Sequence, residues 1–163
     1  GAVALYHVEA VTPEACARSM LAENYGRLTV SDLAPGYALL NDSTERVDLV
    51  WIGCPHASLE ELARVAVLLR GKRLQRPLWV TCARPLLARA AEAGLLEPIE
   101  AAGGRVFADA CLAIAPVQAL GFGAVATPSA KGAFYLRNLA GVAVHFGTLE
   151  QCVAAAIQGR WEG

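Results

Sequence analysis

The chain has 163 residues, of which 55% are hydrophobic and 18% charged, with a formal net charge of −1. This is enough for one domain with a packed core. The near-neutral charge without a basic face argues against nucleic acid as a partner. No apolar run reaches the ~18 residues needed to cross a membrane, so no membrane association is expected.

The five cysteines include no Cys-x-x-Cys pair, and no basic region precedes an apolar stretch at the start of the chain. An odd number of cysteines without a secretory signal predicts reduced thiols and a cytoplasmic protein. The opening residues, GAVALYHVEA, read as a chain that starts inside a strand. We therefore expect residues 1–163 to form a single α/β domain, which is interpreted as a fragment of a larger protein.

Apolar runs alternate with amphipathic segments along the whole chain. Such runs, rich in Val, Leu, Ile and Ala, are typical of strands buried on both faces, as in a parallel sheet covered by helices. The expected strands are residues 2–8, 27–30, 48–53, 78–82, 105–109, 123–127 and 142–146.

The segments between these runs carry helical patterns. The expected helices are residues 12–24, 58–72, 85–104 (two short helices broken near Pro98) and 148–159, with a weaker pattern at 31–42. Ser58 with Glu61 and Thr148 with Gln151 have the spacing of capping boxes. Strands alternating with helices predict βαβ units and a three-layer α/β/α sandwich with a mostly parallel sheet.

Polar and reactive side chains follow several expected strands. Ligands of open α/β sheets bind beyond the carboxyl ends of the strands, so these groups are expected to converge there. They are His7, Glu9 and Thr12 after the first strand, Cys54 and His56 after the third, Asp109 and Cys111 after the fifth, and Thr127, Ser129 and Lys131 after the sixth.

Three interpretations of Cys54 stay open on the residues alone. It could be a nucleophile, because a helix start lowers a thiol's pKa, although His56 diverges across a proline and no third group orients it. It could share a metal with Cys111, with a third ligand from Cys82 or another segment. It could also be a buried structural thiol, with His56 capping a turn.

Ser129 and Lys131 stand at an expected helix start, which suits a carboxylate or phosphate. The simpler alternative is an N-cap serine beside a surface lysine. Likewise, His7, Glu9 and Thr12 could reach the same edge of the sheet. A structural role as a helix N-cap is sufficient to account for Thr12.

Five segments in this order resemble the catalytic region of the aconitase X family, the iron–sulfur dehydratases related to aconitase. They are LYHVEAVTPEA (5–15), VDLVWIGCPHASLEEL (47–62), GGRVFADAC (103–111), ATPSAKGAFYL (126–136) and GTLEQCVAAAIQGRW (147–161). Two positions depart from the family pattern. Ala10 stands where a glycine is expected, and Pro128 where an asparagine is expected.

The resemblance implies an aconitase-like domain at the C-terminal end of a larger catalytic subunit, inactive in isolation. It implies an iron–sulfur cluster, 4Fe–4S or 2Fe–2S, held by Cys54, Cys111 and a cysteine from an earlier segment of the large subunit. The implied partners are that segment and a small swivelling subunit. The implied substrate is a small hydroxy acid such as cis-3-hydroxy-L-proline or a mevalonate phosphate.

The resemblance also suggests roles for individual residues. Lys131 would hold the substrate anion, Ser129 would act as the base or contact a carboxylate, and His56 would orient substrate or assist the leaving hydroxyl. His7, Glu9 and Thr12 would bind substrate together with Ser129 and Lys131. Two alternatives remain, namely an assembly domain that keeps the fold without a cluster, and a cysteine-dependent transferase or hydrolase.

Overall fold

The computed structural model describes residues 5–16 and 24–162, and contacts divide the chain into two units, residues 1–33 and 34–163. In the first unit, the described residues form one short element, the 3₁₀ helix η1 at Pro13–Cys16. All strands of the described residues belong to the second unit.

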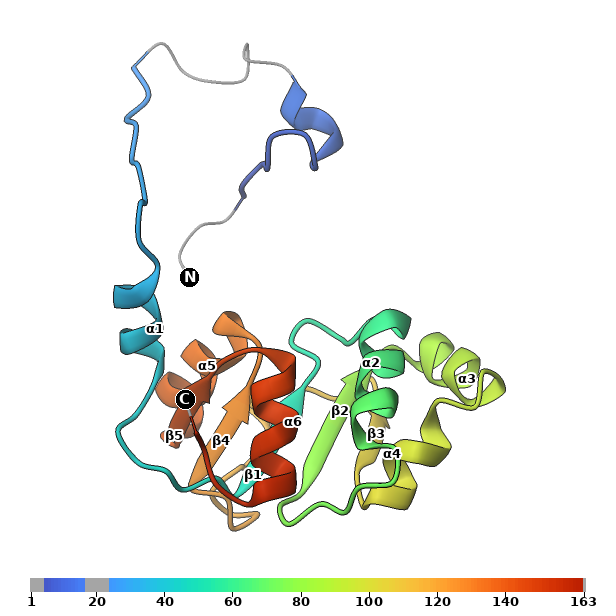
Figure 1. The fold of residues 1–163 in the computed structure, drawn as a ribbon. Helices are drawn as coiled ribbons and strands as arrows, with labels where there is room; N and C mark the ends of the chain where they lie inside the picture. The colour runs from blue at the N-terminus through green and yellow to red at the C-terminus, as the bar shows by residue number, and fades with distance from the viewer. Residues whose placement is uncertain (1–4, 17–23, 163) are drawn as a thin grey trace. The chain divides into compact units, whose positions relative to one another are not determined.

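Five strands of the second unit form one parallel sheet in the order β3-β2-β1-β4-β5 (Figure 1). The strands are β1 (Leu49–Ile52), β2 (Leu78–Cys82), β3 (Arg105–Ala108), β4 (Ala124–Thr127) and β5 (Ala143–Phe146). The direction of winding reverses between β1 and β4. The carboxyl ends of these two strands therefore flank the position where ligands of such sheets bind.

Helices cover both faces of the sheet, which confirms the predicted three-layer sandwich. One face carries α2 (Leu59–Leu69), α3 (Arg84–Glu92), α4 (Leu96–Ala102) and α6 (Leu149–Gln158). The other carries η3 (Leu112–Ile114), α5 (Ala130–Tyr135) and the π-helix η4 (Leu136–Ala140), with α1 (Ala34–Leu40) against α5 and β5.

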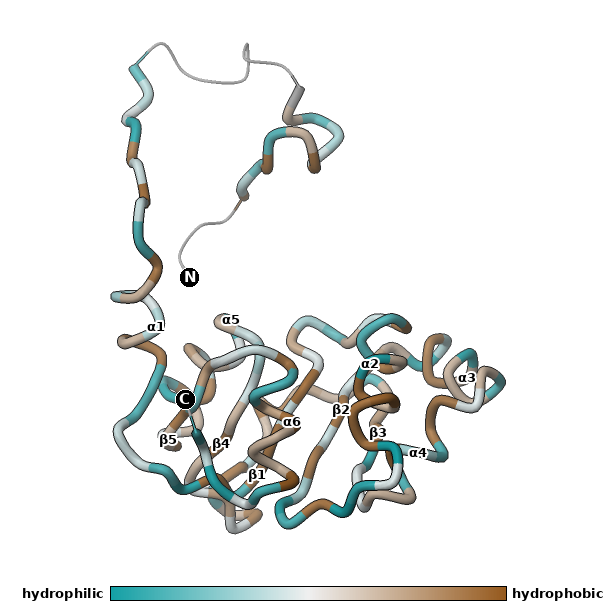
Figure 2. Tube along the Cα trace, viewed as in Figure 1, coloured by the Kyte–Doolittle hydropathy of each residue, from teal (hydrophilic) through white to brown (hydrophobic). Residues whose placement is uncertain are grey.

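Alternate residues of β1 enter two separate cores. Val50 and Ile52 pack toward α2 and α6, while Leu49 and Trp51 pack toward η3 and α5. All four side chains are buried, as expected for a strand in the middle of a covered parallel sheet. Figure 2 shows hydrophobic residues along β2 and on α2.

Both predicted capping boxes are confirmed. The Ser58 hydroxyl accepts the Glu61 N–H at 3.1 Å, and the Glu61 carboxylate accepts the Ser58 N–H at 2.8 Å. Thr148 and Gln151 form the same pair at the start of α6. The break between α3 and α4 lies at Gly94 (φ +67°), and not near Pro98. Pro98 lies in the first turn of α4, where its missing N–H would be unpaired in any case.

Two expected strands are wrong. Residues 5–8, the described part of the first, and residues 27–30 have no regular structure. Their apolar side chains are exposed to solvent, Leu5 to 75% and Leu28 to 88%. A strand forms only where a neighbouring strand takes up its backbone hydrogen bonds, and among the described residues no other strand pairs with these segments. Of the expected helix at 12–24, residues 17–23 lie outside the described residues.

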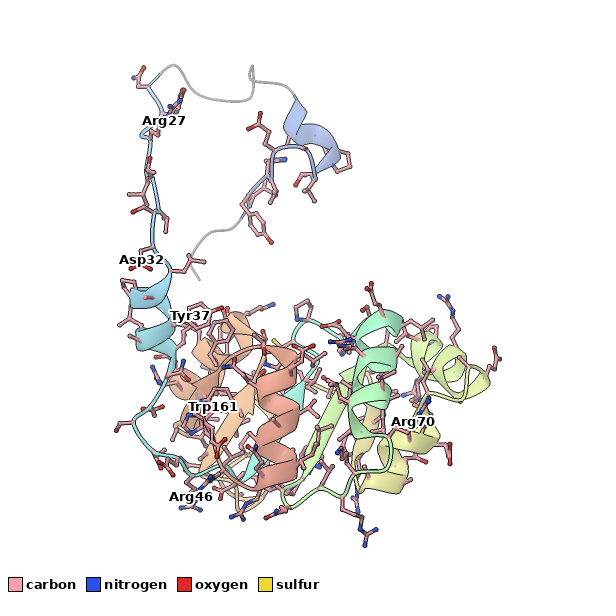
Figure 3. All side chains as sticks on the ribbon, in the orientation of Figure 1. Arg27, Asp32, Tyr37, Arg46, Arg70 and Trp161 are labelled. Carbon is pink, nitrogen blue, oxygen red and sulfur yellow. The ribbon has the colours of Figure 1, made fainter. Side chains whose placement is uncertain are left out.

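The chain's C-terminal end packs against the segment before β1 and against β5. The N–H of Trp161, which is labelled in Figure 3, donates to the Glu45 carbonyl at 2.8 Å. The Trp161 ring stacks on His145 with centroids 5.1 Å apart. His145 is fully buried, and its Nε2 lies 3.0 Å from the Arg46 carbonyl oxygen. In the described part of the chain, no helix is long and apolar enough to span a membrane.

Candidate functional site

The turn after β1 places Cys54 at the carboxyl end of the sheet. Gly53 has φ +110°, and a Cβ there would lie 2.1 Å from the Thr81 carbonyl oxygen, so only glycine allows this approach to β2. The buried Thr81 hydroxyl donates to the Gly53 carbonyl at 2.8 Å and accepts the Trp51 indole N–H at 3.1 Å. Thr81 therefore fixes the end of the strand that leads to Cys54.

Ser129 enters the same region from the neighbouring strand β4. It is the N-cap of α5, as predicted, because its hydroxyl oxygen accepts the Gly132 N–H at 2.9 Å. A Cβ on Gly132 would lie 3.2 Å from both Trp51 and the Ser129 Cβ. The glycine therefore lets the start of α5 pack closely on the side chain of Trp51 in β1.

The electrostatics of Cys54 identify its neighbours. Burial raises the pKa of this half-buried thiol, the Cys111 thiol also raises it, and hydrogen bonding with Ser129 and the charge of Lys131 oppose the rise. Because these interactions weaken with distance, Cys111, Ser129 and Lys131 are all near enough to the Cys54 sulfur to affect its pKa. The structure thus brings four predicted site residues together.

This environment gives no support to a nucleophilic Cys54. Its pKa is raised, whereas an activated nucleophile needs a lowered one. The His56 Nε2 lies 3.2 Å from the Ala110 carbonyl oxygen, which places this ring against the loop after β3. His56 thus joins the loops after β1 and β3.

Cys111 reaches Cys54 although β3 and β1 are not neighbours in the sheet. Asp109, with φ +54°, turns the chain at the end of β3, and its carboxylate accepts the Arg84 N–H and Nε–H, each at 2.9 Å. The chain then crosses back over the sheet, and Leu112 packs in the same core as Trp51. This return of the chain places Cys111 beside the end of β1.

Cys82, considered above as a third ligand, does not join this pair. It is buried in the core under α2 and α6, on the other face of the sheet from Trp51, and burial raises its pKa. Across residues 5–16 and 24–162, no group of three His, Cys, Asp or Glu side chains could hold a metal ion.

Two neighbouring thiols nevertheless fit part of the ligand set of an iron–sulfur cluster, which proteins hold with cysteine thiolates. Cys111 is exposed and Cys54 is half-buried, so both sulfurs can be reached from the carboxyl edge of the sheet. Any further ligand must come from outside the residues described here.

His7, Glu9 and Thr12 lie in the first unit. The Thr12 hydroxyl accepts the Val8 N–H at 2.9 Å, and the Thr12 N–H donates to the Val8 carbonyl at 2.8 Å. Because residues 5–8 form no strand, the argument that these side chains follow a strand end no longer holds. Their role in substrate binding stays a prediction from the family resemblance.

A small apolar cavity that the sequence pattern does not predict lies beside Cys111. It has a volume of about 150 Å³, and its walls include Trp51, Trp79, Phe107, Cys111, Leu112 and Ala115. Trp51 and Trp79 are simplest to interpret from the sequence as core or interface residues. One available signal was their identical place in neighbouring strands, since Trp51 pairs with Trp79 in the sheet register.

Comparisons with known proteins identify the family of this chain. Residues 47–158 match the family described as the aconitase X third domain. The large subunit of phosphomevalonate dehydratase from Methanocaldococcus jannaschii is 37% identical over 153 residues, which cover 93% of this chain and 38% of that protein. The cis-3-hydroxy-L-proline dehydratase of Pseudomonas aeruginosa is 35% identical over 170 residues, which cover 97% of this chain and 29% of that protein.

The crystal structure of Thermococcus kodakaraensis aconitase X in its holo-form superimposes with a TM-score of 0.84 at 38% sequence identity. The match covers 96% of this chain and 40% of that one. The chain therefore spans two fifths or less of the length of these relatives. From the family match over residues 47–158, this chain belongs to the aconitase X family.

Proposed function

We propose that this chain forms part of the catalytic centre of an iron–sulfur-dependent hydro-lyase that dehydrates a small hydroxy acid. The observation that carries the proposal is the meeting of Cys54 and Cys111, from the ends of two non-adjacent strands, next to Ser129 and Lys131. Lys131 adds a positive charge and Ser129 a hydroxyl near the Cys54 thiol, and both groups can bind a substrate anion. The relatives named as dehydratases support the reaction class.

Cys54 and Cys111 would hold the cluster, which supplies a Lewis acid that helps a hydroxyl group to leave. Ser129 is suited to take the proton next to the substrate carboxylate, because the Gly132 N–H stabilises negative charge on its oxygen. In the alternative arrangement, the same hydroxyl contacts the carboxylate. Lys131 provides the positive charge that attracts a substrate carboxylate or phosphate toward the Cys54 side of the site.

His56 would orient the substrate or assist the departing hydroxyl from the loop after β1. Its contact with the Ala110 carbonyl holds the ring beside the segment that carries Cys111. His7, Glu9 and Thr12 would complete the binding of a substrate such as cis-3-hydroxy-L-proline or a mevalonate phosphate. Ala10 and Pro128 stand within or next to these binding segments, where they would alter substrate contacts.

We propose further that residues 1–163 act as one domain of a larger catalytic subunit. The described part of the chain brings two thiols to the site, so activity would require the remaining large-subunit segment and a small swivelling subunit. Free thiols at Cys54 and Cys111 suit a reducing, cytoplasmic compartment. The incomplete donor set is also the observation that favours the alternative, an assembly domain without a cluster.

Anaerobic reconstitution of the complete large subunit with iron and sulfide, in the presence of the small subunit, separates these functions. The proposal predicts a brown chromophore that Cys54→Ser or Cys111→Ser abolishes and the control Cys82→Ala retains. Ser129→Ala should cut turnover while leaving the iron content unchanged. If the wild-type complex binds no iron, or if both serine variants keep the chromophore, the chain is an assembly domain instead.

A further inference from the structure

The cavity beside Cys111 is suited to an apolar occupant. Its walls are mainly apolar and include three aromatic rings, of which Trp79 and Phe107 are in edge contact at a centroid distance of 5.3 Å. The polar group in its lining, the Thr81 hydroxyl, is already bonded to Gly53 and Trp51. The cavity is open to the surface, and a volume of roughly 150 Å³ can take a group the size of a benzene ring.

The surroundings of the cavity have the character of a contact surface. Ile114 is 82% exposed and lies in η3, between Leu112 and Ala115 of the cavity wall. Polar side chains hold the segment that leads to this wall, with Arg84 bonded to Asp109 and His56 next to the Ala110 carbonyl. An apolar centre with a polar rim is typical of surfaces that bind another polypeptide.

The incomplete ligand set indicates which polypeptide this is. Among the residues that the structure describes, two thiols meet at the site, and the chain spans 38% of one large-subunit relative and 40% of a solved aconitase X chain. Because cluster ligands bond to a common centre, a segment that supplies a further ligand must approach Cys111 itself. That segment therefore passes the cavity, whose wall includes Cys111.

We infer that the cavity receives a large apolar side chain from the part of the large subunit outside this chain. This contact anchors the segment that completes the ligand set, and Ile114 extends the contact at the cavity mouth. The inference rests on the proposed function, since it takes Cys111 as a ligand. It adds a docking point that would hold the subunit's parts together before any metal is bound.

Site-specific photo-crosslinking in the complete large subunit identifies the occupant. The residue p-benzoylphenylalanine replaces Ile114, and a matched sample carries it in place of Val67. Val67 is also an exposed β-branched residue (59%), but it lies on α2, which covers the opposite face of the sheet. The expected product links position 114 to a residue of the large subunit that lies outside the 163 residues of this sequence. Position 67 is expected to give no such link.

A second pair of variants tests whether the contact stabilises the assembly. Ile114→Glu should speed hydrogen exchange of residues 110–115 in the metal-free complete subunit about tenfold, while Val67→Glu should leave it unchanged. Ile114 is so exposed that its replacement does not disturb the core. Crosslinks to a second copy, to the small subunit, or to nothing would overturn the inference, as would equal exchange in both variants.

Iron content, measured on the same samples, separates the two proposals. A complete subunit that binds iron but gives no crosslink from position 114 retains the proposed function and refutes the docking contact. A subunit with the expected crosslink that binds no iron under reconstitution retains the contact and refutes the iron–sulfur function.

Discussion

Replacing Thr81 with valine is expected to loosen the end of β1 that positions Cys54. The two side chains have nearly the same shape, but valine cannot pair with the Gly53 carbonyl or the Trp51 indole N–H, both of which are buried. An unpaired buried polar group costs about 1–3 kcal/mol, so the two together lower the free energy of unfolding by about 2–6 kcal/mol. That is a large share of the about 5–15 kcal/mol typical of a domain.

Thr81→Ser is the matched control, because it keeps the hydroxyl and loses one methyl group, at a cost of about 1 kcal/mol. Urea unfolding, followed by tryptophan fluorescence, measures both variants at a constant m value. We also expect iodoacetamide to modify Cys54 faster in Thr81→Val than in Thr81→Ser. A valine variant as stable as the serine variant would refute the argument that this hydroxyl holds the strand end in place.

Three further outcomes follow from the described contacts. Ser58→Ala should lower the free energy of unfolding by about 1 kcal/mol through loss of the α2 cap, visible as a lower urea midpoint. Burial lowers the pKa of His145 below its usual 6.5, and the charge of Arg137 lowers it further. The contact with the Arg46 carbonyl and the charge of Asp42 raise this pKa, but by less. As the pH falls below 6.5, the unfolded chain therefore binds more protons at this histidine than the folded chain does. The contribution of neutral His145 to the free energy of unfolding is complete above pH 6.5 and declines as the pH falls toward the folded-state pKa. Urea midpoints at several pH values should show a weaker acid dependence in His145→Asn, and equal slopes would contradict this. Burial raises the pKa of Cys152 to about 12, so mass spectrometry should find it unmodified by iodoacetamide in the folded chain and modified in urea.

The central sheet was predictable because its strands are buried on both faces and therefore read as uninterrupted apolar runs. The pattern is clear in β1, β2 and β4, whereas β3 at the edge of the sheet is only partly buried. The helix starts were predictable because Ser58 and Thr148 carry their partners three residues further along. The spacing of a capping box is a local sequence signal, and the hydrogen bonds within each box confirm it.

Residues 2–8 and 27–30 carry the same kind of apolar pattern, yet their described parts form no strand. An apolar pattern indicates that a segment is suited to burial. It does not indicate whether a neighbouring strand is available to pair with the segment. The position of the break between α3 and α4 was wrong for a related reason. Proline is tolerated in a first helical turn, and Pro98 lies there, whereas Gly94 adopts the positive φ that ends the preceding segment.

The site was predictable as a set of strand ends, but its assembly was not. Cys54 and Ser129 follow the adjacent strands β1 and β4, so their meeting follows from the strand order. Cys111 follows β3 at the sheet edge, and it returns to Cys54 through the turn at Asp109 and the packing of Leu112. No spacing in the sequence encodes that return, and the apolar cavity depends on it as well.

The claim on which the account depends is that the thiols of Cys54 and Cys111 face each other across a short gap. Cross-linking with the bifunctional thiol reagent dibromobimane tests it directly, in the metal-free chain with Cys16 replaced by serine. The account predicts one fluorescent product whose peptide map joins Cys54 to Cys111, lost in Cys54→Ser and in Cys111→Ser and retained in Cys82→Ala. Bridges that join other cysteines, or reagent attached to Cys54 and Cys111 separately without a bridge, would contradict it.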